Sequence, residues 1–433
     1  MRPSGLRLVA VTLSSPIRRR WRFAALYFSE GAPIGFIWWA LPTRLAAEGV
    51  SIGQITALTS LLVLPWTLKF LWAPLVDACQ TPRWTLRHWI VAAQVVMAAA
   101  LAPLFWLHPA QHFEWLRLTL LIHCIAAATQ DIAIDAWCVE LTREEERGRM
   151  NGWMQTGMLL GRSLLGGGAL VISDWGGPKL VYALLLLAIL PTSLLVIFSS
   201  DRVIPRLRES WSMHYVRLTA ALRHLVRRRV AWLGLGFALI AGAAFEALGA
   251  VQGPLLLSHG WSEAEVGSLT AGPMVLLMVL GALLGGRMAD RWGHVRVSLV
   301  ALLWIALQVT SVGLLLLWSG QREVHRLLPL FLCGEALGIG LLTAASYALF
   351  MDLTDPQLAA TQFTTYMAAT NACEAWAGLV VGQLIGRWNY GPALLMMAGL
   401  SLVGLAFLLQ IPTALQADRG LARPASVPPC DRE

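Results

Sequence analysis

The chain has 433 residues, of which 57% are hydrophobic and only 13% are charged. Because soluble globular proteins are typically about 25% charged, this composition excludes an ordinary soluble domain and is typical of a membrane protein. The formal net charge of +8 does not indicate nucleic-acid binding, because the excess is almost all arginine in loops between apolar runs, where basic residues orient a membrane protein. The cysteines show neither a C-x-x-C pair nor metal-ligand spacing, so we expect no metal and no other cofactor.

Apolar runs recur from Phe23 to Gln410 with only short polar breaks between them. About 20 apolar residues cross the hydrocarbon core of a bilayer, so the sequence predicts an all-α membrane protein with about twelve spans. Their predicted first residues are Phe23, Gln54, His88, Trp115, Met150, Lys179, Val230, Val266, Val295, Leu327, Thr361 and Gly391.

Basic residues are concentrated in alternate loops. The arginine-rich stretches are the first tail, 83–87, 143–149, 202–229 and 287–296, with Arg322 and Arg326 as exceptions in the opposite loops. By the positive-inside rule, this pattern predicts a multi-pass protein of the bacterial inner membrane with both termini in the cytoplasm.

The longest internal polar stretch divides the predicted spans six and six. It includes an amphipathic piece that could lie on the membrane surface, and we interpret it as an interdomain linker. The predicted parts are a cytoplasmic tail at 1–22, a six-helix bundle at 23–200, a cytoplasmic linker at 201–229, a second six-helix bundle at 230–411 and a cytoplasmic tail at 412–433.

The two halves are similar in sequence at an offset of about 212 residues. Glu140-Leu141-Thr142 aligns with Asp352-Leu353-Thr354, Gly49-x-Ser51 aligns with Gly260-x-Ser262, and Asp77 aligns with Asp290. Each match alone is weak, but together they agree with the division into six and six spans. A parallel two-fold repeat is therefore expected.

The loop from Gly286 to Arg296 reads G-R-M-A-D-R-W-G-H-V-R. It resembles the signature cytoplasmic loop of the major facilitator superfamily, G-x-x-x-D-R-x-G-[RH]-x-[RK]. The resemblance implies the major facilitator fold, with two pseudo-symmetric six-helix bundles, and a lock in which Asp290 and Arg291 hold one conformation. The alternative is a basic turn that only sets orientation.

The equivalent loop of the first half departs from that signature and reads K-F-L-W-A-P-L-V-D from Lys69 to Asp77. With Q-D-I-A-I-D-A-W at 130–137 and E-R-G at 146–148, it resembles the AmpG and acetyl-CoA transporter family. We assign Lys69, Asp77 and Arg147 from these motifs to a cytoplasmic gate, together with Asp290 and Arg291 of the signature loop.

The resemblance leaves three substrate branches open. Members of this family include muropeptide importers, acetyl-CoA transporters and siderophore-uptake permeases. The segments Tyr27–Pro33 and Pro65–Lys69 are most similar to the siderophore branch, whereas Glu30 and Ala136 depart from the residues expected there. The substrate is therefore expected to be a siderophore or a muropeptide.

Two acidic residues, Asp131 and Asp135, lie four apart on one face of the fourth predicted span. At 1.5 Å per residue, Asp131 is about 14 Å from Glu140 at the cytoplasmic end, close to the middle of the bilayer. Two carboxylates so close together could bind and release a proton or hold a substrate. The alternative is a structural pair neutralised by Arg162 or Lys69.

Arg162 lies inside the fifth predicted span, and Glu374 occupies the equivalent position of the eleventh. A buried guanidinium needs a partner, and we expect Asp131 or Asp135 on the adjoining span to be that partner. An anionic substrate could replace the carboxylate, which would couple binding to its release.

Spans one, seven and ten carry Glu30, Glu246 and Glu335. Charged residues within a membrane avoid lipid, so we expect these acids to face a central cavity. His123 is the offset partner of Glu335, and a neutral histidine bonded to a backbone carbonyl is the simpler interpretation for it. Trp38 could stack on a ring-bearing substrate, although packing is the simpler role.

These observations predict a monomeric secondary transporter that imports a polar or anionic small molecule by alternating access, with protons as the driving ion and the lipid bilayer as its solvent. No Walker motif is present, so ATP is not the expected energy source. Two other classes stay open. One is a membrane-embedded enzyme that uses Asp131 and Asp135 as acid and base on a lipid-linked substrate, and the other is a sensor that binds a ligand without transporting it.

Overall fold

A computed structural model describes residues 15–81, 83–142, 146–199, 216, 219, 228–354 and 359–421. These residues are almost entirely helical, and no strand occurs among them. The prediction of a surface linker at 201–229 lies almost wholly outside the described residues, as do most of the two predicted tails. A bilayer offers no hydrogen-bond partners to the backbone, so helices that satisfy their own backbone groups are the expected solution.

The first half of the chain is a series of long helices interrupted by short turns of other helix types. Its elements are α1 (Pro16–Gly35), the π-turn η1 (Phe36–Ala40), α2 (Leu41–Ala47), α3 (Ile52–Leu68), the 3-10 turn η2 (Lys69–Leu71), α4 (Ala73–Ala78), α5 (Leu86–Leu101), the 3-10 turn η3 (Ala102–Phe105), α6 (Phe113–Leu141), α7 (Arg147–Arg162), the π-turn η5 (Ser163–Gly167) and α8 (Gly168–Ile197).

The second half repeats this plan. Its elements are α10 (Arg229–Ile240), α11 (Ala243–Ser258), α12 (Glu263–Leu269), the π-turn η6 (Thr270–Met274), α13 (Val275–Trp292), α14 (His294–Trp318), α15 (Gln321–Leu353), α16 (Ala359–Trp388), α17 (Tyr390–Leu408) and α18 (Ile411–Leu421).

Nine segments of the described chain are long and apolar enough to cross a membrane by length and composition. One of them, Gly152–Ile197, contains two helices, because Gly177 has a left-handed backbone conformation (φ 73°) that breaks α8. The continuous helix α1 to α2 and helix α16 are of similar length but fall outside that criterion. The nine described segments hold ten spanning helices, because one segment contains two, and these two further helices would bring the number to the predicted twelve. That α1 to α2 and α16 each cross the membrane stays a prediction.

The first and tenth spans begin earlier than predicted, at Pro16 rather than Phe23 and at Gln321 rather than Leu327. In both cases the residues before the apolar run are polar or basic but good helix formers. They extend the helix beyond the part that hydropathy detects.

The repeat inferred from sequence has a structural counterpart at the start of two helices. Gly49 and Gly260 both have positive φ values, 84° and 87°. Ser51 and Ser262, two residues later, both accept a hydrogen bond from the backbone at the start of the next helix, α3 and α12. A left-handed glycine followed by an N-cap serine is a compact way to reverse the chain between helices.

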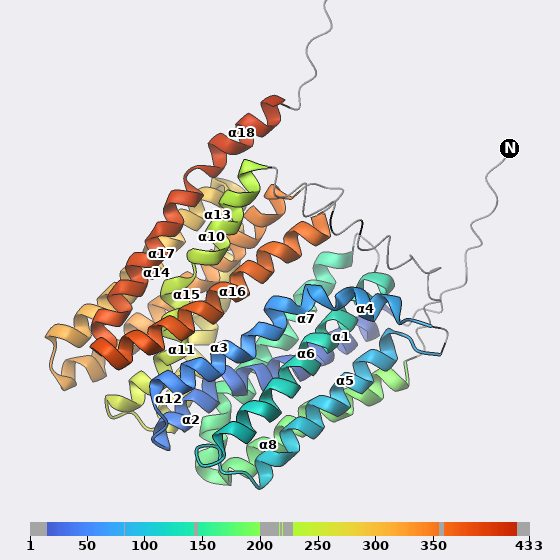
Figure 1. Cartoon of the computed structure of the whole chain (residues 1–433), viewed down its shortest axis with the longest axis horizontal. Helices are drawn as coiled ribbons and strands as arrows, with labels where there is room; N and C mark the ends of the chain where they lie inside the picture. The colour runs from blue at the N-terminus through green and yellow to red at the C-terminus, as the bar shows by residue number, and fades with distance from the viewer. Residues whose placement is uncertain are drawn as a thin grey trace, which may run out of the picture.

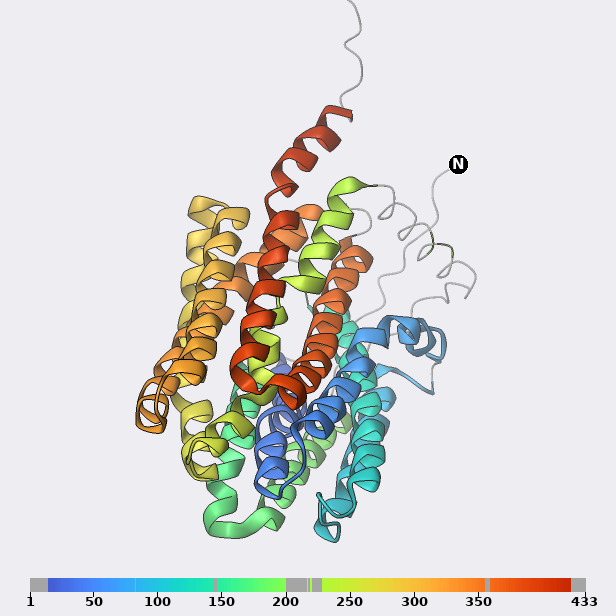
Figure 2. The ribbon, with the colours of Figure 1, turned by 60° about the vertical axis from the view of Figure 1, so that its left-hand side comes forward.

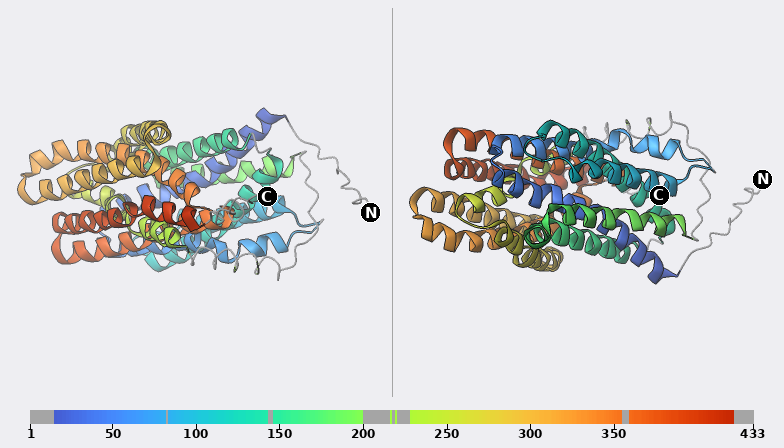
Figure 3. Two further views of the ribbon diagram at one scale, coloured as in Figure 1. Left: turned by 90° about the horizontal axis from the view of Figure 1, so that it is seen from above. Right: turned by 90° about the horizontal axis from the view of Figure 1, so that it is seen from below.

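The helices gather into two bundles, one from each half of the chain (Figure 1). Within the first, α1 packs along α7 and α5 along α6, and within the second, α13 packs along α15 and α14 along both α15 and α17. Views from above and below show the helices of both bundles running roughly along one direction (Figure 3). The architecture is therefore the predicted pair of helical bundles.

The first helix of each half begins at the same end of the molecule, which we call the terminal end (Figure 2). The opposite end, which we call the loop end, carries the connections after α2, α11 and α16. The most extensive contacts between the halves are those of α3 with α16, α12 with α8 and α11 with α2.

Close backbone approach joins the halves toward the loop end. The hydroxyl of Ser163 donates a hydrogen bond to the carbonyl of Ala271 at 2.7 Å. Gly167 lies so close to this chain that an added Cβ would be 2.4 Å from Thr270 Oγ1 and 2.5 Å from the Ala271 nitrogen. The π-turns η5 and η6 therefore contact each other directly, and η1 packs against η5.

Candidate functional site

A buried charge cluster lies in the first bundle, where α1, α3 and α6 meet. The ammonium group of Lys69 forms an ion pair with Asp131, and the two side chains are 22% and 9% exposed. The hydroxyl of Tyr27 donates a hydrogen bond to Asp135 one helical turn away. Lys69 reaches α6 because α3 ends there in a tight 3-10 turn.

Glu30 completes this first-bundle cluster, which we define as Tyr27, Glu30, Lys69, Asp131 and Asp135. Its side chain is 1% exposed, and its Oε2 atom has no hydrogen-bond partner. It interacts electrostatically with Lys69 and with both aspartates. Three carboxylates thus share one ammonium group inside the bundle. Such an arrangement is costly with all three charged, so it is suited to bind and release a proton.

Two expectations for these residues need correction. Lys69 was assigned to a cytoplasmic gate, but its side chain lies in the interior and pairs with Asp131, as in the alternative that Lys69 or Arg162 neutralises the two aspartates. Arg162 was also expected to pair with either Asp131 or Asp135. Arg162 instead projects from the end of α7 toward the second bundle, where its electrostatic partners are Glu246 and Glu374.

A second cluster spans the two bundles, and we call it the inter-bundle cluster. Arg162 is its member from the first bundle, whereas Glu246 on α11, Glu335 on α15 and Glu374 on α16 come from the second. Glu246 interacts electrostatically with the other two acids and with Arg162. At about 1.5 Å per residue, Arg162 and Glu374 lie about 22 Å along their helices from the terminal end, deeper than Asp131 at about 15 Å.

The charged groups of the inter-bundle cluster are near one another without touching. Arg162 makes no ion pair within 4 Å in the described part of the chain, and its Nε has no hydrogen-bond partner. Arg162, Glu246 and Glu374 are all partly exposed to solvent although they lie in the interior. Solvent-accessible space therefore lies beside these charges.

Aromatic side chains border the inter-bundle cluster. Trp38 on η1 lies with its indole beside the carboxylate of Glu374. Tyr347 on α15 interacts with Arg162, Glu246 and Glu374 and is 39% exposed. Because α15 runs toward the terminal end, Tyr347 lies on that side of the cluster.

His123 and Glu335 occupy the equivalent positions of α6 and α15 but differ in their surroundings. The Nδ1 atom of buried His123 bonds the Met97 carbonyl at 3.0 Å. This is the simpler role that was considered for this histidine. Glu335 is 1% exposed, and its Oε1 has no partner. No group of histidine, cysteine and acidic side chains among the described residues is arranged to hold a metal ion.

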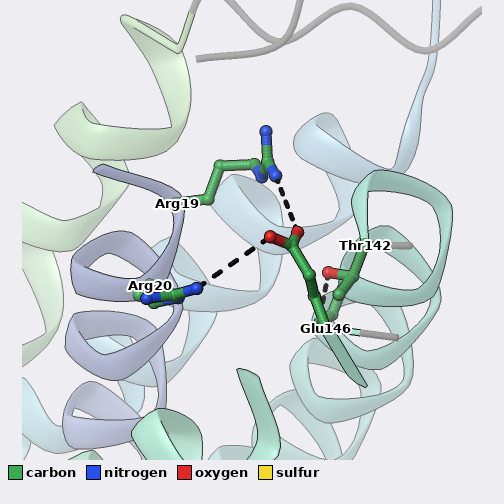
Figure 4. A network of polar contacts seen from close by, with 5 residues as sticks. Arg19, Arg20, Thr142 and Glu146 are labelled. Carbon is green, nitrogen blue, oxygen red and sulfur yellow. Dashed lines mark hydrogen bonds and ion pairs between the residues drawn. The ribbon is translucent and has the colours of Figure 1, made fainter. Parts of the chain in front are cut away.

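The remaining gate residues lie at the terminal end. Asp290 and Arg291 are exposed at the end of α13, whereas the side chains of Asp77 and Arg147 lie outside the described part. Glu146, beside Arg147, pairs with Arg19 at 3.3 Å and with Arg20 at 3.9 Å (Figure 4). This network joins α1 to the start of α7 and lies within one bundle.

Three contributors to the clusters were not among the predicted site residues. Glu374 was noted only as the counterpart of Arg162, although a charged residue in an apolar helix is itself a signal of function. Tyr27 and Tyr347 are ordinary aromatic residues in sequence. Only the tertiary structure brings their hydroxyls beside the acids.

The family model of the Major Facilitator Superfamily matches residues 23–251 and 237–428. Among curated proteins, the anhydromuropeptide permease of Escherichia coli (strain K12) is 28% identical over 406 residues, covering 91% of this chain and 80% of the relative. A transporter of Rickettsia conorii named AmpG 4 is 21% identical over 397 residues, covering 89% of this chain and 94% of the relative.

Solved structures with the same fold cover almost the whole chain. The D-xylose-proton symporter has a TM-score of 0.70 at 12% identity and covers 92% of this chain and 98% of its own. The nucleoside transporter NupG has a TM-score of 0.67 at 13% identity, covering 91% and 99%. A bacterial homolog of the lysosomal transporter Spinster, solved in an inward-facing and unoccupied conformation, has a TM-score of 0.65 at 16% identity, covering 96% and 100%.

Proposed function

The chain belongs to the Major Facilitator Superfamily of secondary transporters, and on that premise we propose that it imports a muropeptide across the inner membrane with protons as the coupling ion. Its relatives are permeases, so the chain is a transporter rather than an enzyme. The observation that carries the choice of substrate is the similarity to the anhydromuropeptide permease, which extends over 91% of the chain.

The proposed direction of opening follows from the positive-inside rule. If the arginine-rich loops are cytoplasmic, the terminal end faces the cytoplasm and the loop end faces the periplasm. The direct contact of η5 with η6 then closes the periplasmic side. The exposed Tyr347 lies on the cytoplasmic side of the inter-bundle cluster. These features support an inward-open conformation, ready to release a solute into the cytoplasm.

Proton coupling is supported by the composition of the first-bundle cluster. Lys69 neutralises Asp131, which leaves Glu30 and Asp135 without a cation of their own. A proton that binds to either acid removes a charge from a low-dielectric interior, where charge is expensive. We propose that this proton enters with the solute and that a single chain suffices, since both bundles belong to one monomer.

A siderophore is the second candidate substrate. The two segments that resemble the siderophore branch, Tyr27–Pro33 and Pro65–Lys69, supply Tyr27, Glu30 and Lys69 to the first-bundle cluster. The resemblance therefore falls on residues with a structural role in the proposed coupling site rather than on peripheral positions.

Uptake into proteoliposomes tests both candidates. We expect labelled anhydromuropeptide to accumulate when the outside is acidic and to be lost when a protonophore collapses the gradient. Asp131→Asn should reduce accumulation at least tenfold, because Lys69 then has no partner and the coupling site loses its charge balance. The matched control is Glu114→Gln, which changes an exposed acid on the same helix and should leave uptake unchanged.

Each result of this experiment has one meaning. Uptake of a ferric siderophore in place of the muropeptide would replace the first candidate by the second. Accumulation that persists with a protonophore would contradict proton coupling, and equal accumulation by Asp131→Asn would remove Asp131 from the mechanism. Absence of uptake for both solutes would reject the proposed function.

A further inference from the structure

The inter-bundle cluster has no part in the coupling mechanism proposed above, yet it joins the two bodies that must move during transport. It combines one cation from the first bundle with three acids from the second. A solute that binds between the two bundles of a transporter contacts both of them, so its binding can stabilise one relative position of the bundles over another.

Arg162 has the properties of an anion-binding residue. The residue is partly exposed, its buried Nε has no hydrogen-bond partner, and no carboxylate of the described residues lies within ion-pair distance. A planar guanidinium with free donors matches a carboxylate in two parallel hydrogen bonds. Arg162 is partly accessible to solvent, and the indole of Trp38 beside Glu374 offers a flat apolar surface to the group that carries the anion.

Glu246 and Glu374 have that same cation as their compensating charge. Glu335 is 1% exposed with an unpartnered oxygen, and it faces Glu246. The other groups around them are Glu374 and Cys373 on α16 and Tyr347 on α15. Among the described residues that interact with these acids, Arg162 is the one cation.

We propose that Arg162 binds a carboxylate of the transported solute and that the glutamates of the inter-bundle cluster take up protons when it does so. An anion on the guanidinium removes the compensation that Arg162 gives to Glu246 and Glu374, and each further negative charge in this interior is costly. A proton that converts a carboxylate to a neutral carboxyl group restores the balance. Solute binding should then become tighter as the pH falls.

This inference rests on the proposed function only in assuming a carboxylate-bearing solute. It assigns a second proton-binding site, in the second bundle, that is separate from the first-bundle cluster. A solute bound by its cationic group, attracted by the three acids, would have the opposite consequence, because binding would release protons and would weaken as the pH falls.

Calorimetry on the purified full-length protein tests the proposal with two matched probes. The first is an anhydromuropeptide with free carboxylates, and the second is the same compound with every carboxylate converted to a carboxamide. Titrations in two buffers of different ionisation enthalpy count the protons exchanged. We expect the acid to bind with uptake of about one proton, and the amide to bind on the order of 10- to 100-fold more weakly without that uptake, which is the range for one charged hydrogen-bonded contact.

Variants assign the effect to residues. Arg162→Gln should bind the acid and the amide equally, whereas Glu374→Gln should keep the preference for the acid and lower the number of protons taken up. Arg117→Gln, an exposed change on α6, is the control for charge removal and should match the unmodified protein. Equal binding of both probes by the unmodified protein, or proton release on binding, would overturn the inference while leaving the proposed transport intact.

A measurement without ligand keeps the inference testable if neither probe binds. Infrared absorbance of protonated carboxyl groups should increase in Arg162→Gln relative to the unmodified protein at neutral pH, because the glutamates have lost their cation. Adding Glu374→Gln to that variant should remove part of the gain. No change in absorbance would overturn the inference, whereas a change together with absent muropeptide and siderophore uptake would reject only the proposed function.

Discussion

At the scale of residues, the interior charges are divided between two clusters according to which side chains can reach each other. Lys69 lies at the end of α3 beside α6 and pairs with Asp131. Arg162 lies farther from the terminal end and interacts with acids on α11 and α16 of the second bundle. The sequence identified both cations and every acid except Glu374 as unusual, because each is an ionisable residue in an apolar helix. It did not determine the pairing.

The Lys69 to Asp131 pair should matter for stability as well as for coupling. Lys69→Met leaves Asp131 charged and unpartnered, and breaking a fully buried pair costs about 3 to 5 kcal/mol. Lys69 is 22% exposed, so solvent weakens the effect. We therefore expect the free energy of unfolding to fall by about 2 to 3 kcal/mol, at or below the lower end of that range. Thermal unfolding in detergent measures the effect.

The chain offers an exposed ion pair for comparison. Arg117 and Glu114 pair at the start of α6 with side chains 49% and 70% exposed. Arg117→Met should cost less than about 1 kcal/mol. The double variant Lys69→Met with Asp131→Asn should recover most of the lost stability, since no unpaired charge remains. A Lys69→Met protein as stable as Arg117→Met would contradict the interior placement of the pair.

At the scale of elements, interruptions in the helices coincide with contacts between bundles. The π-turns η1, η5 and η6 pack one against the next at the place where the bundles touch. A π-turn adds a residue to a helical turn and changes the direction in which side chains and carbonyls project, and such turns are common at functional sites. Gly167 ends η5, where the backbone of Ala271 approaches too closely for a side chain.

Gly167→Ala should therefore disfavour the conformation in which the loop ends touch. The added Cβ would lie 2.5 Å from a backbone nitrogen that cannot rotate away, and overpacking of this kind costs about 1 to 3 kcal/mol. Spin labels on the exposed residues Ala47 and Glu323 at the loop end should report a longer distance between the bundles. Gly272→Ala is the control, because its Cβ would meet nothing within 4 Å. Unchanged distances in both variants would show that this contact does not hold the bundles together.

At the scale of the whole molecule, contacts at the loop end and exposed groups at the terminal end describe one conformation of a transporter with two moving bundles. Asp290 and Arg291, predicted to hold a gate, are exposed here. That is the expected state of a gate residue when its own side of the protein is open. We therefore propose that these two residues act in the alternate conformation, in which the terminal ends would close.

Substitution of the gate residues should separate stability from transport. Asp290→Asn and Arg291→Gln should change the free energy of unfolding by less than about 0.5 kcal/mol, as expected for exposed side chains. Uptake should fall several-fold, because the conformation closed at the terminal end loses a contact. Arg287→Gln is the control: it lies about one turn earlier, and among the described residues its side chain bonds only the Leu283 carbonyl of its own helix. Full uptake by all three variants would favour the alternative in which this loop only sets orientation.

The amino-acid sequence alone determined the membrane environment, the division into two halves, the family resemblance and nearly all members of the two clusters. These properties are local: apolar length, loop charge, short motifs and the rarity of charge in a span are all legible along one chain. The equivalence of Gly49-x-Ser51 with Gly260-x-Ser262 was equally legible, and the structure gives it a common turn geometry.

Only the tertiary structure decided which charges meet, that Lys69 belongs to the interior and that Arg162 faces the second bundle. The physical reason is that partner choice depends on the packing of helices far apart in sequence, and spacing along one helix carries no information about its neighbour. In the same way, the contact of η5 with η6 depends on how closely two backbones approach each other. Hydropathy describes which residues avoid water, whereas the arrangement of the bundles determines which of the remaining polar groups meet in the interior.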